Sequence, residues 1–194
     1  VVIDHYIFGA SHNPSAANIN TKGNKMFGEA DPEYIDLLEE RFADTIVELA
    51  GKTEDITSVK YQNVDIDGLY SNRNDANKLA DKKVHLLGFY KEDTMVALYV
   101  TLSMHNTVLG PLNYAITGET FGYLRNKLEK EYNCTVLMAQ GTAGDMGNRQ
   151  YRTGQEFKDM EKLGENLFEQ IMRKQWGWED IDMDAISHKH IVYD

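Results

Sequence analysis

The fold class of this chain follows from the stretch "MVALYVTLSMHN", Met95 to Asn106. The part up to Ser103 is apolar almost throughout, which is typical of a central β-strand buried on both faces. A helical pattern from about Glu119 to Tyr132 follows, and then the strand-like run "TVLMAQ" and a second helical pattern. Strand, helix, strand and helix in succession predict a crossover between parallel strands. We therefore expect an α/β fold, a three-layer sandwich with a mixed, largely parallel sheet and helices on both faces.

The sequence before this stretch predicts a long helix and the first strand of a β-hairpin. The segment "DPEYIDLLEERFADTIVELAGK" offers Asp31 as a cap, a proline at the first helical position, and Gly51 beyond the end. Its apolar residues recur at helical spacing and predict a core-facing stripe of Ile35, Leu38, Phe42, Ile46 and Leu49. The run "VHLLGFY" predicts a strand that pairs with the one from Met95 across the polar turn "KEDT". The opening "VVIDHYIFGAS" is interpreted as a further buried strand.

Length and charge limit the classes of function open to the chain. Its 194 residues suit one α/β domain, residues 1–194. The formal net charge of −11 argues against a nucleic-acid partner, because binding to polyphosphate relies on clustered lysine and arginine. No run reaches the roughly 18 apolar residues of a membrane span, so no transmembrane segment is expected. The single cysteine, Cys134, excludes an internal disulfide and a zinc site built from several cysteines.

Three polar residues fall on loops that leave the carboxyl ends of predicted strands. His12 lies in "FGASHNPSAAN", His105 follows the strand from Met95, and Asp145 lies in "QGTAGDMGN". In open α/β sheets, ligand sites gather on such loops. Imidazole is a good zinc ligand, and a catalytic zinc usually takes three protein ligands and a water molecule. Spacing alone leaves open whether the two histidines bind a metal or only cap their loops.

Each of the other candidate site residues has two possible interpretations. Arg73, in "YSNRNDANK", is placed either to stabilise an oxyanion or simply in solvent. Asp145 either orients a ligand histidine or caps its own turn. His188 and His190 share one face of a strand, which suits either a metal or an exposed edge. The chain has no Gly-x-Ser-x-Gly elbow, so a serine nucleophile has no support.

Four segments, taken in order, resemble motifs of the catalytic domain of the neutral/alkaline non-lysosomal ceramidase family. "GASHNPSA" is similar to a His-x-His-Ser motif at a strand end, and "SNRNDAN" to an Asn-Arg-Ser loop. "VTLSMHNTVLGPLNYAITGETFGYLRNKLE" resembles a strand that ends in a metal-binding histidine, followed by Ser/Thr-Gly-Asp and a Gly-Tyr helix. "AQGTAGDMGN" resembles a Gln-Gly-x-x-Gly-Asp loop. Together the segments cover most of residues 7–171.

The resemblance implies a zinc-dependent amidase that hydrolyses linear amides, with ceramide as the family's default substrate. A small-molecule or lipid amide is then the expected partner, and the oligomeric state stays open. Carried over by position, His12 and His105 would bind Zn²⁺. Arg73 would be catalytic and would contact the polar head of the substrate, which Asn13 would also bind. Asp145 would be catalytic through the shape of the loop beside the metal.

The resemblance also implies a longer protein and a secreted or cell-surface location. The chain starts without methionine, and we expect it to be part of a longer ceramidase-like catalytic domain. The glutamate and tyrosine that complete the family's zinc site have no match in the sequence.

Three positions depart from the family pattern. Pro14 stands where the motif has its second histidine, Gly147 replaces a serine, and Glu119 replaces an aspartate. Proline cannot transfer a proton. Two alternatives to a ceramidase therefore remain: a non-catalytic binding module on the same fold, and a metal-assisted hydrolase of another N-acyl substrate.

Overall fold

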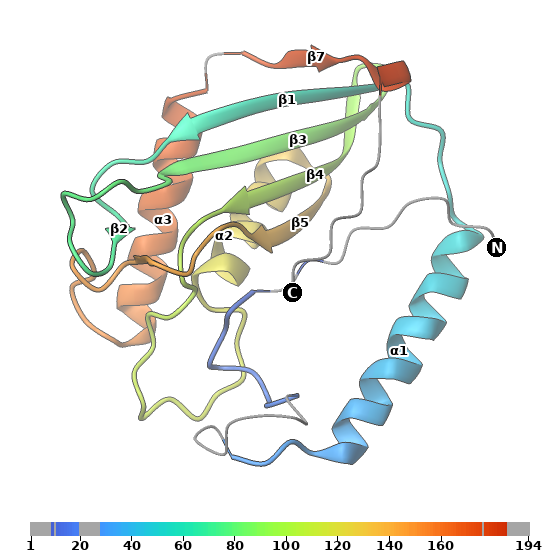
Figure 1. The fold of residues 1–194 in the computed structure, drawn as a ribbon. Coiled ribbons are helices and arrows are strands. Elements are labelled where there is room, and N and C mark those ends of the chain that lie inside the picture. The colour runs from blue at the N-terminus through green and yellow to red at the C-terminus, as the bar shows by residue number, and fades with distance from the viewer. Residues whose placement is uncertain (1–8, 10, 20–27, 176, 186–194) are drawn as a thin grey trace.

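The computed structural model describes residues 9, 11–19, 28–175 and 177–185, and its centre is a five-stranded sheet (Figure 1). The strands lie in the order β5-β4-β3-β1-β7. Their bounds are β1 (Ser58–Asp65), β3 (Lys83–Lys91), β4 (Thr94–Leu102), β5 (Thr135–Gln140) and β7 (Glu179–Ile181). A second, two-stranded sheet pairs β2 (Ser71–Asn72) with β6 (Met146–Gly147). The helices are α1 (Pro32–Ala50), α2 (Glu119–Tyr132), α3 (Phe157–Arg173) and a short 3₁₀ helix, Met183–Ala185. The α/β class is as predicted.

The sheet is mixed, but it is mostly antiparallel. The predicted crossover is present, because β4 and β5 pair in parallel and α2 connects them. The other three pairings, β1 with β3, β3 with β4 and β1 with β7, are antiparallel. The expectation of a largely parallel sheet is therefore wrong. The reason is the hairpin: only Glu92 and Asp93 separate β3 from β4, and so short a connection joins antiparallel strands only.

One face of the sheet packs against α2 and α3 and forms the core. On β4 the side chains of Leu98, Val100 and Leu102 are buried, whereas Ala97 and Tyr99 on the other face are half-buried. The helices contribute Phe121, Leu124, Leu128, Met160, Leu163, Leu167 and Ile171 to the same buried cluster. β4 is therefore fully buried on one face, and not on both as its composition predicted.

Helix α1 has the predicted ends but not the predicted packing. The Asp31 side chain accepts hydrogen bonds from the backbone N–H groups of Glu33 and Tyr34, and Gly51 ends the helix. None of its side chains is buried, and Phe42, in the middle of the apolar stripe, is 60% exposed. Figure 1 shows α1 to one side of the sheet. The expected third layer, with helices on both faces, is therefore not formed by α1.

Several sequence-based predictions lie outside the described residues. These are most of the opening strand, and the pair His188 and His190. Within the residues that are described, no helix is long and apolar enough to cross a membrane.

Candidate functional site

His12 and His105 meet beyond the carboxyl end of β4. Their ring centroids are 4.8 Å apart and their planes make an angle of 65°. Two imidazoles bound to one tetrahedral zinc would lie about 5 Å apart between ring centres, because each zinc–nitrogen bond is about 2 Å long. The structure thus brings together the two residues predicted as metal ligands, at a separation that suits one ion.

A backbone carbonyl fixes the orientation of His105. Its Nδ1 lies 2.7 Å from the carbonyl oxygen of Met146. Met146 lies in the segment "GTAGDMGN" after β5, which we call the Gly-rich loop. A carbonyl oxygen only accepts hydrogen bonds, so Nδ1 carries the proton and donates it. The lone pair then lies on Nε2, which is the usual arrangement of a histidine that binds a metal.

Gln140 holds the segment that carries His12. The backbone N–H of His12 donates to Oε1 of Gln140 at 2.6 Å, and Nε2 of Gln140 donates to the carbonyl of Met104 at 2.9 Å. Desolvation lowers the pKa of His12, and the electrostatic influence of His105 and of Arg73 lowers it further. A lowered pKa favours the neutral imidazole, which is the form that binds a metal.

Asn13, the predicted substrate-binding residue, uses its amide to link its own loop to the segment before α2. Nδ2 donates to the carbonyl of Thr117 at 2.6 Å, and Oδ1 accepts the N–H of Ser15 at 2.9 Å. Asn13 is not among the residues that line the cleft beside the histidines. In this structure it positions the loop that presents His12.

Glu119 is a buried carboxylate behind the same loops, and sequence reasoning noted it only as a departure from a motif. It is 1% exposed, and it accepts the backbone N–H groups of Val108 at 2.8 Å and Leu109 at 3.0 Å. Burial raises its pKa, although these hydrogen bonds oppose the effect. Glu119 therefore holds the loop that follows His105 against the start of α2.

The small β2–β6 ladder brings Arg73 next to the Gly-rich loop. The N–H of Arg73 donates to the carbonyl of Asp145 at 2.7 Å. The carboxylate of Asp145 accepts a hydrogen bond from Nδ2 of Asn72 at 2.7 Å, and it does not line the cleft. A Cβ on Gly147 would lie 3.1 Å from Cβ of Arg73. The family motif has serine at this position. Glycine here leaves room for the side chain of Arg73, which lies next to it.

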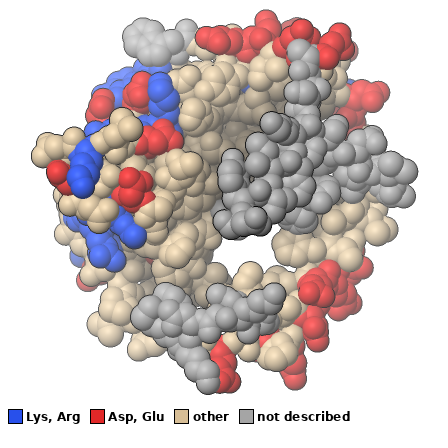
Figure 2. All heavy atoms as spheres, in the orientation of Figure 1, with Lys and Arg blue, Asp and Glu red and all other residues tan. Residues whose placement is uncertain are grey.

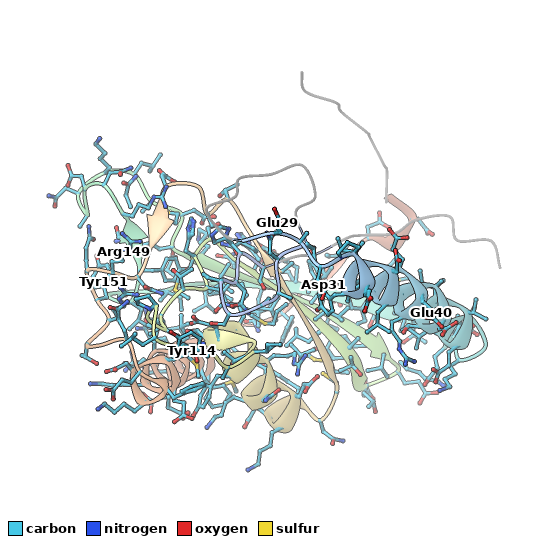
Figure 3. All side chains as sticks on the ribbon, turned by 90° about the horizontal axis from the view of Figure 1, so that it is seen from below. Glu29, Asp31, Glu40, Tyr114, Arg149 and Tyr151 are labelled. Atoms are coloured by element: carbon cyan, nitrogen blue, oxygen red, sulfur yellow. The ribbon has the colours of Figure 1, made fainter. Side chains whose placement is uncertain are left out.

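The two histidines open into a cleft of about 310 Å³. Its walls include His12, Pro14, Arg73, His105, Arg149 and Arg152. Figure 3 shows Arg149 beside Tyr151, at the end of the molecule away from α1. Sequence reasoning missed Arg149 and Arg152. The available signal was the pair of arginines in "NRQYR", directly after the Gly-rich loop.

The residues present fit a zinc ion in part. Two of the three protein ligands that a catalytic zinc usually takes are in place. Across the described ranges, no group of three His, Cys, Asp or Glu residues is arranged to hold a metal ion.

The fold of this chain is similar to part of two solved ceramidase structures. One, a ceramidase complexed with C2, matches 60% of this chain and 22% of its own with a TM-score of 0.52 and 14% identity. The other, the neutral ceramidase from Pseudomonas aeruginosa, matches the same shares with a TM-score of 0.50 and 17% identity. No family model and no curated protein matches the sequence.

The structural matches confirm a ceramidase-like fold, which the four sequence motifs predicted. At these identities the likeness concerns the fold alone. The match spans about a fifth of the length of the ceramidase chains.

Proposed function

We propose that this chain is the metal-binding part of a ceramidase-like hydrolase of linear amides. The observation that carries the proposal is the histidine pair: His12 and His105 face each other at the mouth of a cleft. Hydrogen bonds to Met146 and Gln140 hold them in place. The likeness in fold to ceramidases supports the same class of reaction.

Three residues that line the cleft have roles in this proposal. His12 and His105 hold Zn²⁺ through ring nitrogens. When bound, zinc lowers the pKa of a coordinated water to about 7 and polarises a carbonyl. Arg73 stabilises the negative charge that develops on the amide oxygen. Pro14 offers no proton, so the proton for the leaving amine has to come from another group.

A lipid amide is the proposed class of substrate. An apolar groove of about 680 Å³ lies beside the cleft, lined by residues 109–113 and 154–157. Leu109 and Gln155 line both the groove and the cleft, so the two spaces adjoin. Leu112, on the rim of the groove, is 83% exposed. An acyl chain lying in this groove would place its amide next to the histidines.

Zinc binding tests the proposal directly. The full chain, freed of metal and titrated with Zn²⁺ in competition with a chromogenic chelator, should bind one equivalent, and His105→Ala should lose it. The control is His85→Ala, since His85 lies in β3 with Nδ1 2.7 Å from the Tyr61 hydroxyl. Equal zinc affinity in the wild type and His105→Ala would overturn the proposed metal site.

Pro14 favours a second candidate, a non-catalytic binding module on the same fold, because a proton-transferring side chain is absent at that position. This candidate predicts that the zinc-loaded protein binds N-acyl amides without hydrolysing them. Hydrolysis that stops on chelation excludes it. A panel of N-acyl sphingosines, N-acyl amino acids and N-acyl sugars, assayed for released amine, also separates a ceramidase from a hydrolase of another N-acyl substrate.

A further inference from the structure

The cleft beside the histidines is strongly positive, although the chain as a whole is acidic. Arg73, Arg149 and Arg152 all line it, and no Asp or Glu of the described residues does. None of these three arginines forms an ion pair within the part of the chain that is described. Figure 2 shows Lys and Arg gathered on the side that carries β2 in Figure 1, and Asp and Glu along the region of α1 and β7.

Arg152 is fixed in the wall of this cleft. Its Nη1 donates to the carbonyls of Thr107 at 2.9 Å and Val108 at 3.1 Å, in the loop after His105. The side chain is half-buried, and burial lowers its pKa. The positive charge of Arg149 lowers this pKa further, and the carboxylate of Glu119 raises it. Arg149 and Arg152 line the same cleft.

Positive groups held together in a partly buried cleft repel one another, and an anion bound between them relieves that repulsion. Guanidinium groups suit this role because their planar set of N–H donors matches the oxygens of a carboxylate or a phosphate. Within the described part of the chain, Arg152 makes these hydrogen bonds through Nη1 alone, so its other nitrogens are available to a ligand. The apolar groove adjoins the cleft at Leu109, which lines both.

We propose that the cleft selects N-acyl amides whose amine portion carries an anionic group, a carboxylate or a phosphate. The proposal rests on the proposed function and deepens it, because it names the class of substrate for the same site. Arg149 and Arg152 bind the anion, Arg73 stays beside the amide, and the acyl chain lies in the groove.

Binding measured without turnover tests this. The full chain, treated with a chelator so that no ligand binds through a metal, is titrated calorimetrically with N-octanoylglycine and with N-octanoylglycinamide. The two probes share their acyl chain and amide and differ by one charge. The carboxylate should bind at least about fivefold more tightly, as expected when charge-assisted hydrogen bonds form in a partly exposed site. N-octanoyl-phosphoethanolamine forms the third arm and shows whether phosphate or carboxylate is preferred.

Variants assign the effect to the cleft. Arg149→Gln should remove most of the preference for the charged probe, so that the variant binds N-octanoylglycine and N-octanoylglycinamide with similar affinity. The matched control is Arg125→Gln, which removes an exposed arginine on α2 that pairs with Glu129. Equal binding of the charged and neutral probes by the wild type would overturn the inference, as would equal loss of the preference in both variants.

The two proposals fail separately. Zinc binding that depends on His105, combined with no preference for the charged probe, leaves the proposed function and removes the anion site. A charge preference that depends on Arg149, in a protein that does not bind zinc through His105, leaves the anion site and removes the hydrolase.

Discussion

Hydrogen bonds to Met146 and Gln140 hold the two candidate metal ligands. Met146 contributes only its carbonyl oxygen to His105, and Gln140 contributes a side chain to the backbone of His12. Neither role depends on a side chain that could itself bind a metal. The identity of Gln140 matters nevertheless, because its amide both accepts from His12 and donates to Met104.

We expect Gln140→Ala to weaken zinc binding about tenfold, the lower end of the range for residues that position a metal ligand. The reason is that the His12 segment loses its hydrogen bond to the end of β5. The chelator competition assay measures the change. Gln150→Ala is the control, since among the described residues Gln150 makes one long hydrogen bond, 3.5 Å to the carbonyl of Asn72. Unchanged zinc affinity in Gln140→Ala would show that the bridge does not position His12.

Glu119 gives the stability of the domain a characteristic dependence on pH. Burial raises its pKa in the folded state, so the folded chain holds this proton more tightly than the unfolded chain does. The stability from this group is fully present below the ordinary pKa of a glutamate. It is lost as the pH rises through the raised folded-state pKa.

We therefore expect the difference in unfolding free energy, wild type minus Glu119→Gln, to fall as the pH rises above the ordinary pKa of a glutamate, as measured by urea unfolding at a series of pH values. Glutamine does not titrate, so the variant lacks this decline. Glu40→Gln on the exposed surface of α1 serves as the control for loss of a carboxylate. Parallel curves for the wild type and Glu119→Gln would refute the assignment.

Helices α2 and α3 pack closely because of a glycine between them. The ring of Tyr123 on α2 lies over Gly164 on α3, where a Cβ would come within 2.5 Å of Cδ1 of Tyr123. Glu165 adds polar contacts to the same interface, since it accepts the hydroxyl of Tyr123 and the ammonium of Lys127, both at 2.9 Å. The lysine lowers the pKa of Glu165.

Alanine at two helix glycines should have opposite effects. Gly164→Ala should destabilise the domain by about 1–3 kcal/mol, because the added methyl group meets the Tyr123 ring. Gly122→Ala in α2 should stabilise it by up to about 1 kcal/mol, since a Cβ there meets nothing within 4 Å and alanine is the better helix former. Chemical unfolding measures both. A stabilising Gly164→Ala would mean that the two helices are not in this close contact.

Local patterns predicted the elements well, and non-local contacts account for what they missed. The predicted and observed bounds of α2 and β5 agree, because the spacing of apolar residues is a property of the segment itself. The direction of β1 and β7 depends on which strand each one pairs with, and the segment does not encode this. The apolar stripe of α1 likewise indicates a face without specifying a partner for it.

The same distinction applies to the candidate site. His12 and His105 were identified because each follows a predicted strand, and the carboxyl ends of strands meet at one edge of a sheet. Arg149 and Arg152 reach the cleft only through the path of the loop between β6 and α3. That path depends on contacts such as the one from Arg152 to the carbonyl of Thr107, which leave no periodic pattern in the sequence.

Across the whole molecule, stability should come from the sheet with α2 and α3, and little of it from α1. Leu124 on α2 is fully buried, whereas no side chain of α1 is buried. The charge is unevenly distributed as well: Glu40 on α1 and Arg149 lie at opposite ends of the molecule (Figure 3).

We expect Leu124→Ala to cost about 2–5 kcal/mol of unfolding free energy, the usual range for a buried leucine. Phe42→Ala, on the exposed stripe of α1, should change it by less than about 0.5 kcal/mol. Calorimetric or chemical unfolding of the two variants gives the comparison. A loss at Phe42 as large as that at Leu124 would mean that α1 packs against the domain in solution.

The hydrogen bonds that hold the His12 segment affect how fast the cleft assembles and how fast a bound metal is released. Gln140 lies 128 residues along the chain from His12, and Thr117 lies 104 residues from Asn13. Joining segments so far apart loses chain entropy that only a formed domain offsets. The cleft is therefore among the last features to assemble. His12 is exposed, and its segment can detach from Gln140 by local opening while the sheet stays intact. The lifetime of a bound metal would then be set by this local opening and not by unfolding of the core.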